Sequence, residues 1–203
     1  MDADRYIHTV HKGADEGPLL FVFHGTGGDE HQLVALGREL LPQATIVSPR
    51  GDVSEQGSAR FFRRTGEGVY DLDDLARATQ SMSAFIGAQR AKFSHTPVYG
   101  LGYSNGANIL ASVLFAHPGL FDAAVLMHPL IPFEPNIEGD LEGLKVLITA
   151  GRRDPICPPN LTMRLDGYLR TKSADVTLEW HEGGHEIRPN EIETAAKFLR
   201  ANL

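Results

Sequence analysis

Short apolar runs of the kind that form buried strands recur along most of the chain. Most are apolar at consecutive positions rather than at alternate ones, which indicates strands covered on both faces, as in a parallel sheet flanked by helices. On this basis we predict strands at residues 6–11, 18–24, 44–48, 97–101, 123–127, 145–149 and 176–180.

Between these runs, apolar side chains recur three or four positions apart, which is the spacing of an amphipathic helix. We predict helices at residues 29–41, 71–92, 105–116, 160–171 and 189–201. Regular alternation of strands and helices indicates an α/β fold with right-handed crossovers. The predicted architecture is a mostly parallel sheet of about seven strands with helices on both faces and no large cap.

Two segments, 50–70 and 129–143, show no clear periodicity. Loops of this length in a compact domain are often binding loops or lids. No stretch with the composition of a linker interrupts the 203 residues, so we predict a single domain over residues 1–203.

Composition and charge narrow the classes of function. The formal net charge is −7, and such a surface repels phosphates and anionic lipid, so we expect neither nucleic-acid binding nor charge-driven membrane docking. No apolar run approaches the roughly 20 residues that cross a bilayer, so we expect no membrane insertion. Residues 1–5 do not begin a signal peptide, and one cysteine allows no internal disulfide, so we expect a cytoplasmic protein. The sequence leaves a homodimer open.

The pattern Gly-x-Ser-x-Gly occurs at residues 102–106, with Ser104 at its centre. A predicted buried strand precedes it and a predicted amphipathic helix follows it. This is the setting of a nucleophile elbow, in which the glycines permit a tight turn and the serine is presented at the carboxyl edge of the sheet. We therefore predict Ser104 as a nucleophile.

A serine nucleophile needs a general base, and position discriminates among the nine histidines. Catalytic groups in open α/β sheets gather at the carboxyl ends of the strands. His128 and His181 each end a predicted strand, whereas His185 follows a Gly-Gly pair that lets the loop turn back over the sheet. We prefer His185 as the base. Asp154 follows the sixth predicted strand, at the same edge, and is the candidate acid that fixes the tautomer of the base.

A glycine-rich segment, HGTGG at residues 24–28, follows the second predicted strand. Glycines let the backbone approach a substrate and aim N–H groups at developing negative charge. We expect the N–H groups of Thr26 and Asn105 to form an oxyanion hole, and we interpret His24 as a hydrogen-bonded structural residue. The spacings of phosphate-binding loops are missing, and the histidines lack metal-ligand spacing, so we predict neither a cofactor nor a metal.

Four motifs together carry a resemblance to a known family: FHGTGGD at 23–29, GYSNGAN at 102–108, GRRDPI at 151–156 and GGHE at 183–186. The chain resembles the phospholipase/carboxylesterase family of α/β-hydrolases, which includes bacterial carboxylesterases and acyl-protein thioesterases. The motifs follow the order nucleophile, acid, base, and they span most of the chain. The resemblance implies a serine carboxylesterase that hydrolyses a small-molecule ester through an acyl-enzyme intermediate. Because 203 residues leave little sequence for a large cap, we expect a shallow, open pocket that favours esters of short to medium acyl length.

Two alternatives stay open beside this reading. The first is acyl-protein thioesterase or lysophospholipase activity, although thioesterases of the family usually carry Gly-Phe-Ser-Gln-Gly at the elbow, and Tyr103 and Asn105 depart from that pattern. The second is a catalytically silent protein that keeps the hydrolase fold to bind a ligand. A binding protein would not need to retain all three catalytic residues.

The residues expected beside the substrate flank the motifs or lie in the first irregular segment: Gly25, Phe61, Phe62, Tyr103 and Ile156. For the Phe-Phe pair, local packing is an equal alternative, with Arg63 and Arg64 either at the pocket mouth or paired with nearby acids. Cys157 is open to two interpretations as well, a thiol near the site or a small buried apolar residue.

Overall fold

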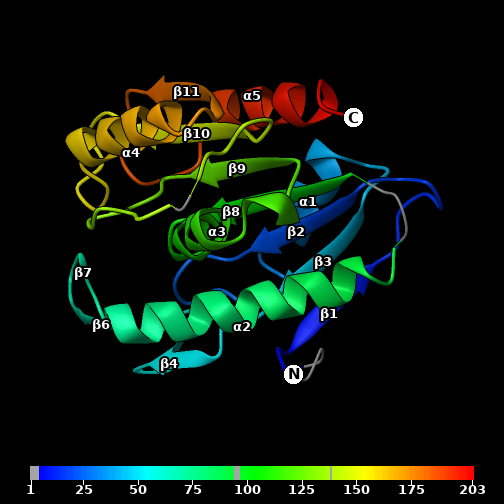
Figure 1. Cartoon of the computed structure of the whole chain (residues 1–203), viewed down its shortest axis with the longest axis horizontal. Coiled ribbons are helices and arrows are strands. Elements are labelled where there is room, and N and C mark those ends of the chain that lie inside the picture. Colours follow the sequence, from blue (N-terminus) through cyan, green and yellow to red (C-terminus); the bar gives the residue numbers. More distant parts are fainter. Residues whose placement is uncertain (1–4, 94–96, 138) are drawn as a thin grey trace.

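The fold is built around a seven-stranded sheet with the order β1-β3-β2-β8-β9-β10-β11 (Figure 1). The strands are β1 (His8–His11), β2 (Leu19–Phe23), β3 (Thr45–Pro49), β8 (Val98–Tyr103), β9 (Ala123–Met127), β10 (Lys145–Gly151) and β11 (Asp175–His181). β1 is antiparallel to β3, and the other neighbouring strands are parallel. The predicted, mostly parallel sheet is confirmed.

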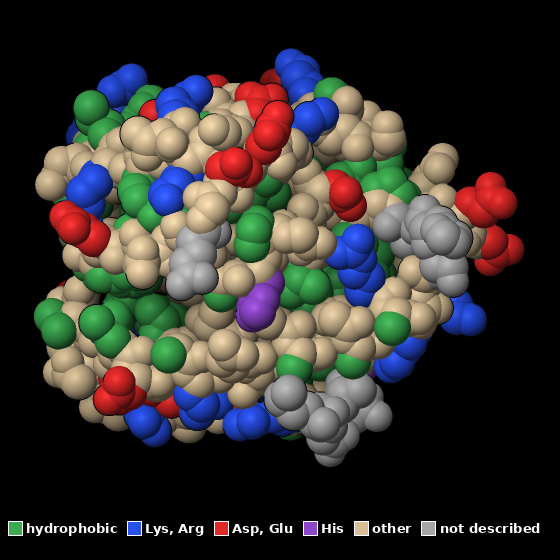
Figure 2. Space-filling model, viewed as in Figure 1, with side chains coloured by type: hydrophobic (Ala, Val, Ile, Leu, Met, Phe, Trp, Pro, Cys, Tyr) green, Lys and Arg blue, Asp and Glu red, His purple; other side chains and the backbone are tan. Residues whose placement is uncertain are grey.

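The computed structural model describes residues 5–93, 97–137 and 139–203. Residues 1–4, which contribute to the expectation of no signal peptide, lie outside this description. Within the described ranges, no helix combines the length and the apolar character that a membrane crossing requires. On the face drawn in Figure 2, basic and acidic side chains are interspersed rather than gathered by sign.

Helices cover both faces of the sheet, as predicted (Figure 1). They are α1 (Val34–Leu40), α2 (Leu72–Arg90), α3 (Asn105–Ala116), α4 (Pro159–Thr171) and α5 (Pro189–Arg200), with a 3-10 turn at Pro118–Leu120. α2, α3 and α4 share one apolar core with the sheet, and α1 and α5 share a second core on the opposite face.

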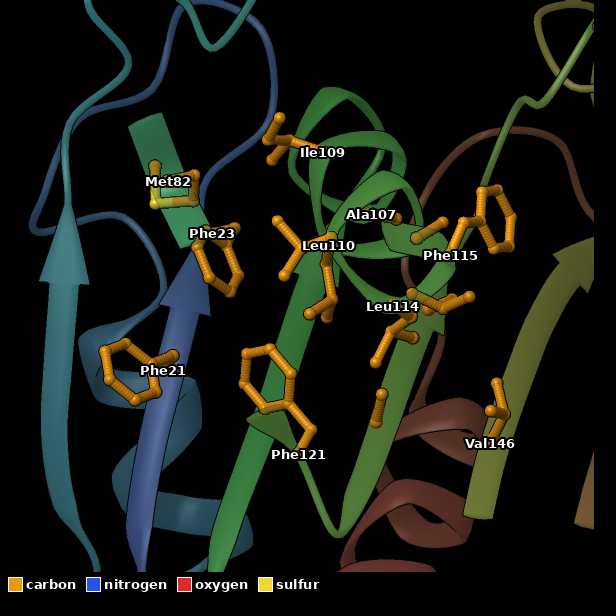
Figure 3. Packing of buried hydrophobic residues seen from close by; sticks show 14 of the residues in the cluster. Phe21, Phe23, Met82, Ala107, Ile109, Leu110, Leu114, Phe115, Phe121 and Val146 are labelled. Carbon is orange, nitrogen blue, oxygen red and sulfur yellow. The ribbon is translucent and has the colours of Figure 1, made fainter. Parts of the chain in front are cut away.

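The strand β2 shows why its sequence is apolar at every position. All five of its residues are buried. Phe21 and Phe23 face the core beneath α2 and α3, whereas Leu20 and Val22 face the core beneath α1 and α5. Figure 3 shows Phe23 beside Leu110 of α3, and the ring of Phe21 packs against Phe121. Burial on both faces also fixes the register of the strand, because a slip by one residue would exchange the two sets.

Two predictions of local structure differ from the fold. The helix predicted from residue 29 begins only at Val34, because the Asp29 carboxylate accepts from the N–H of His31 at 2.9 Å and holds a turn there. The segment 50–70 contains two short hairpins, β4 (Val53–Glu55) with β5 (Ser58–Arg60) and β6 (Arg64–Gly66) with β7 (Val69–Tyr70). Strands of two or three residues are too short to show a period.

Candidate active site

Ser104 occupies the sharp turn between β8 and α3. Its φ of 53° and ψ of −116° lie outside the regions that side-chain-bearing residues usually adopt. A Cβ on Gly106 would overlap the carbonyl oxygen of Phe23, and one on Gly102 would collide with the backbone of Gly106. The two glycines are therefore required by space, and the turn is the strained elbow that the sequence predicted.

The structure brings three of the predicted residues into one continuous series of contacts. Ser104 Oγ lies 2.8 Å from His185 Nε2, and His185 Nδ1 lies 2.7 Å from Asp154 Oδ2. Asp154 follows β10, and His185 belongs to the loop after β11. The hydroxyl of Tyr103 donates to the backbone oxygen of His185 at 2.8 Å, which fixes this loop over the elbow. His181 is not part of the series with Ser104.

The carboxylate of Asp154 is hydrogen-bonded at both oxygens. Oδ1 accepts from the backbone N–H groups of Ile156 and Cys157 at 2.8 and 2.9 Å, and Oδ2 also contacts His128 Nδ1 at 3.0 Å. Burial favours the neutral acid, but the hydrogen bonds from His128, His185 and Cys157 outweigh it and hold the pKa of Asp154 well below its usual range. The carboxyl group of Asp154 is therefore ionised in the folded protein near neutral pH.

The predicted oxyanion-hole residues lie on either side of the serine. Asn105 is the first residue of α3, so its N–H has no acceptor within the helix, and the helix N-terminus adds a positive partial charge. Thr26 lies in the loop after β2, beside the same cavity. Its hydroxyl accepts from the guanidinium of Arg60 at 2.7 Å, which places a buried cation next to the loop.

A cavity of about 570 Å³ opens in front of Ser104 and His185. Its wall combines charged, polar and apolar side chains, and the apolar ones come mainly from the segments after β9 and β10. The lining residues are Thr26, Arg60, Arg64, Glu67, Gly68, Tyr70, Tyr103, Ser104, Asn105, Asn108, Leu130, Pro132, Pro155, Ile156, Cys157, Pro158, Leu161 and His185.

Comparison with known proteins gives this geometry a family. The family model described as the dienelactone hydrolase family matches residues 63–188, which is more than half of the chain. The chain belongs to the dienelactone hydrolase family. MhqD of Bacillus subtilis, a protein described as a hydrolase by provisional assignment, is 40% identical over 195 residues. The match covers 95% of this chain and 97% of MhqD.

Two solved structures extend the comparison. The structure of Atu2452, a protein of unknown function from Agrobacterium tumefaciens, is 58% identical in sequence and superposes with a TM-score of 0.94. The match covers 100% of this chain and 100% of that one. The Bacillus cereus carboxylesterase is 37% identical with a TM-score of 0.93, covering 98% of this chain and 96% of that one. The resemblance to carboxylesterases of the α/β-hydrolase fold is confirmed, and the protein is a hydrolase of the esterase type.

Only some of the residues predicted to lie beside the substrate line the cavity of this dienelactone hydrolase family member. Tyr103 and Ile156 line the cavity. Gly25 lies behind Tyr103, where a Cβ would come within 2.9 Å of the tyrosine ring. Phe61 and Phe62 are 1% and 0% exposed and pack into the core beneath α2 and α3, so the packing alternative holds for both.

Two of the three arginines between residues 60 and 64 lie in the cavity wall. Arg60 and Arg64 line the cavity and share the carboxylate of Glu55, at 3.3 Å for Arg60 and 2.9 Å for Arg64. Burial, followed by the neighbouring Arg64, lowers the pKa of Arg60. Arg63 instead pairs with Asp71 at 3.3 Å. This agrees with the alternative in which the arginine pairs with a nearby acid rather than lying at the pocket mouth.

Two polar residues of the wall escaped the sequence analysis. Asn108 accepts from the N–H of Leu130 at 2.7 Å and donates to the hydroxyl of Tyr70 at 2.8 Å. These contacts tie the cavity wall to α3. Asn108 ends the GYSNGAN motif, which assigned it no role, and Tyr70 lies outside the four motifs. Cys157 is buried, and burial raises the pKa of its thiol, so it is not poised as a thiolate.

Among the described residues, two groups of side chains lie close enough together to resemble a metal site. One is His128 with Asp154 and His185, and the other, which is fully buried, is His128 with His181 and Glu191. The backbone N–H of Gly183 donates to His181 Nδ1 at 2.9 Å, so in the neutral ring the proton is on Nε2. That Nε2 faces Glu191 at 3.1 Å and has no lone pair to offer a metal. The proton assignment therefore argues against metal binding by this group.

Proposed function

We propose that the protein is a serine carboxylesterase that hydrolyses small-molecule esters of short to medium acyl length with Ser104, His185 and Asp154 as its catalytic residues. The observation that carries the proposal is the continuous series of contacts from Ser104 Oγ through His185 to Asp154 at the floor of the cavity. A nucleophile, a base and an orienting acid in this arrangement are the requirements of acyl transfer.

In the proposed reaction, His185 Nε2 takes the proton of Ser104 as the serine oxygen attacks the ester carbonyl carbon. The resulting oxyanion accepts hydrogen bonds from the N–H groups of Thr26 and Asn105. The imidazolium of His185 then protonates the departing alcohol and leaves an acyl-enzyme. Water, deprotonated by the same histidine, attacks the acyl-enzyme, and the collapse of the second intermediate returns the proton to Ser104 and releases the acid.

The cavity wall supports the proposed chain length. Arg60, Arg64 and Glu67 place charged groups in it, and the apolar part is confined to segments such as Ile156 and Leu161. A long acyl chain would have to desolvate charged groups without pairing them, which is unfavourable. Esters with short or medium acyl chains fit the apolar part alone.

The experiment that tests the proposal is a series of kcat/KM values for p-nitrophenyl esters from acetate to palmitate, with butyryl thioester alongside, for wild type and Ser104→Ala. We expect butyrate to exceed palmitate and Ser104→Ala to lose turnover by a factor on the order of 10⁶. Thioester preferred over the matched ester would favour the thioesterase alternative. Wild-type protein without turnover would favour the silent ligand-binding alternative.

A further inference from the structure

A second set of buried ionisable side chains lies behind Asp154, and none of its members lines the cavity. His128, at the end of β9, donates from Nδ1 to Asp154 Oδ2 at 3.0 Å. Its Nε2 lies 3.0 Å from Glu191 Oε1 of α5. Glu191 Oε2 in turn lies 3.1 Å from His181 Nε2 at the end of β11. His128 and Glu191 are both 0% exposed.

The positions of the protons follow from these contacts. His181 is a donor at Nε2, because its Nδ1 accepts from the N–H of Gly183. Both ring nitrogens of His128 lie 3.0 Å from a carboxylate oxygen, Nδ1 in a hydrogen bond and Nε2 in a charge contact that is not aligned as a hydrogen bond. An unprotonated nitrogen at that distance would repel the oxygen. His128 is therefore an imidazolium held between Asp154 and Glu191.

Electrostatics support this assignment. Burial opposes the charged form of the ring, but its contacts with Asp154 and Glu191 outweigh burial and raise the pKa of His128 to about 9. Burial likewise opposes the charge on Glu191, and the contacts with His128 and Thr149 outweigh it and lower the pKa of that carboxyl. The titratable groups that face His128 come from every element around it: Tyr103, Asp154, Cys157, His181, His185 and Glu191.

The backbone of His128 is constrained as tightly as its ring. Its φ of 52° is left-handed, a region that residues other than glycine seldom adopt. Its N–H donates to the carbonyl oxygen of Thr149 at 2.9 Å, and its own carbonyl oxygen accepts from Cys157 Sγ at 3.2 Å. Ser104, at the end of the neighbouring strand, has a φ of 53°. Backbone strain of this kind is concentrated at functional sites.

We propose that His128 is a positioning residue of the esterase reaction: its imidazolium, anchored by Glu191, holds Asp154 in place behind His185 and reduces the negative charge that His185 experiences. The inference rests on the proposed function. Because the imidazolium partly neutralises the charge of Asp154 from behind, removing it makes the surroundings of the base more negative. When His185 takes the serine proton, the series of His185, Asp154, His128 and Glu191 carries no net charge.

The test is the pH dependence of kcat/KM for p-nitrophenyl butyrate in His128→Asn. The amide of asparagine takes the place of ring Nδ1, so the hydrogen bond to Asp154 is kept and the positive charge is lost. The rings of His128 and His185 are 5.2 Å apart. In His128→Asn the buried Glu191 is left without its cation and takes up a proton, and the loss of its negative charge, on the far side of residue 128, offsets part of the change. We expect the acid limb of the profile to move to higher pH by about one unit, with KM unchanged at the optimum.

A structural role alone predicts a different outcome. If His128 were only structural, His128→Asn would lower the fraction of active enzyme, which is measured by titration with a fluorophosphonate. The acid limb of the pH profile would not move. His181→Gln is the matched control, because it changes a buried histidine of the same set without removing a charge, and its acid limb should not move. His8→Asn, on β1 at the far edge of the sheet, controls for the substitution itself.

Two further measurements keep the inference open to refutation. If His128→Asn does not fold, the double variant His128→Asn/Glu191→Gln removes both buried charges together and should show the same shift of the limb. In wild-type protein labelled with ¹⁵N-histidine, both ring nitrogens of His128 should be protonated at pH 8, and a neutral ring there would overturn the inference. Turnover in Ser104→Ala would refute the proposed function, and the role of His128 with it. An inactive Ser104→Ala together with an unmoved limb in His128→Asn would refute the role of His128 alone.

Discussion

Replacing Asp154 by asparagine tests the acid of the proposed triad, because every partner of its carboxylate is a donor. Oδ1 accepts two backbone N–H groups, and Oδ2 lies 2.7 Å from His185 Nδ1 and 3.0 Å from His128 Nδ1. An asparagine amide must turn its NH₂ group toward one of these pairs of donors. With its oxygen toward the backbone, its NH₂ faces His185 Nδ1, which must then become an acceptor. The proton of His185 moves to Nε2, where it can no longer take the proton of Ser104.

The magnitudes follow from this geometry. By analogy with the same substitution in serine proteases, the wrong tautomer lowers kcat roughly 10⁴-fold, which is about 5.5 kcal/mol of transition-state stabilisation. Removing one carboxylate from the buried His128 pair also destabilises the fold, by about 3 kcal/mol. Both losses come from one atom, so the variant should be less stable as well as inactive.

The assay measures kcat for p-nitrophenyl butyrate in Asp154→Asn, with folding checked by circular dichroism and the free energy of unfolding by urea titration. Asp166→Asn, which removes one partner of a helix-surface pair with Arg170, is the matched control and should stay within about twofold of wild type. If Asp154→Asn keeps more than about a tenth of wild-type kcat, or loses activity only in proportion to the unfolded fraction, the reasoning is wrong.

Three other predictions follow from the fold and the buried charges. Gly106→Ala should unfold the elbow or inactivate the enzyme, since its Cβ would overlap the Phe23 carbonyl, and soluble expression with kcat measures this. Phe61→Ala should lower the free energy of unfolding by about 3–5 kcal/mol because the side chain lies in the core; a changed KM at unchanged stability would restore its pocket role. The charge of His128, whose pKa is raised to about 9, contributes about 3 kcal/mol of stability that is complete below about pH 6.5 and lost as pH rises toward 9. Urea titrations at pH 6 and pH 9 should show this loss in wild type, and the loss should vanish in His128→Asn/Glu191→Gln.

The elements that the sequence predicted well are those with a strong local signal. β9 and α3 match their predicted bounds. The continuous apolar run of β9 and the helical periodicity of α3 are each compatible with few other structures. The elbow at Ser104 follows from two glycines at fixed spacing. His185 and Asp154 were predicted as base and acid because topology places strand ends at one edge, and there His185 Nδ1 lies 2.7 Å from Asp154 Oδ2.

What the sequence could not supply depends on contacts between distant segments. Phe61 and Phe62 follow a strand end, which is compatible with a pocket, and only the packing of α2 and α3 shows that they belong to the core. In the sequence, Glu191 lies in the first turn of a predicted helix. An acidic residue at that position is usually exposed and is favoured there by the helix dipole. Its burial against His128 and His181 arises when α5 folds onto the ends of β9 and β11, and no local pattern reports that.

The central claim is that Ser104 is the nucleophile, and active-site labelling tests it most directly. Wild-type protein is treated with a fluorophosphonate, with and without excess p-nitrophenyl butyrate, and the adduct is located by peptide mass spectrometry. The account predicts one adduct per chain, on Ser104, that forms more slowly in the presence of the ester and is missing from both Ser104→Ala and His185→Ala. An adduct on another residue, or no adduct on an enzyme that hydrolyses the ester, would contradict it.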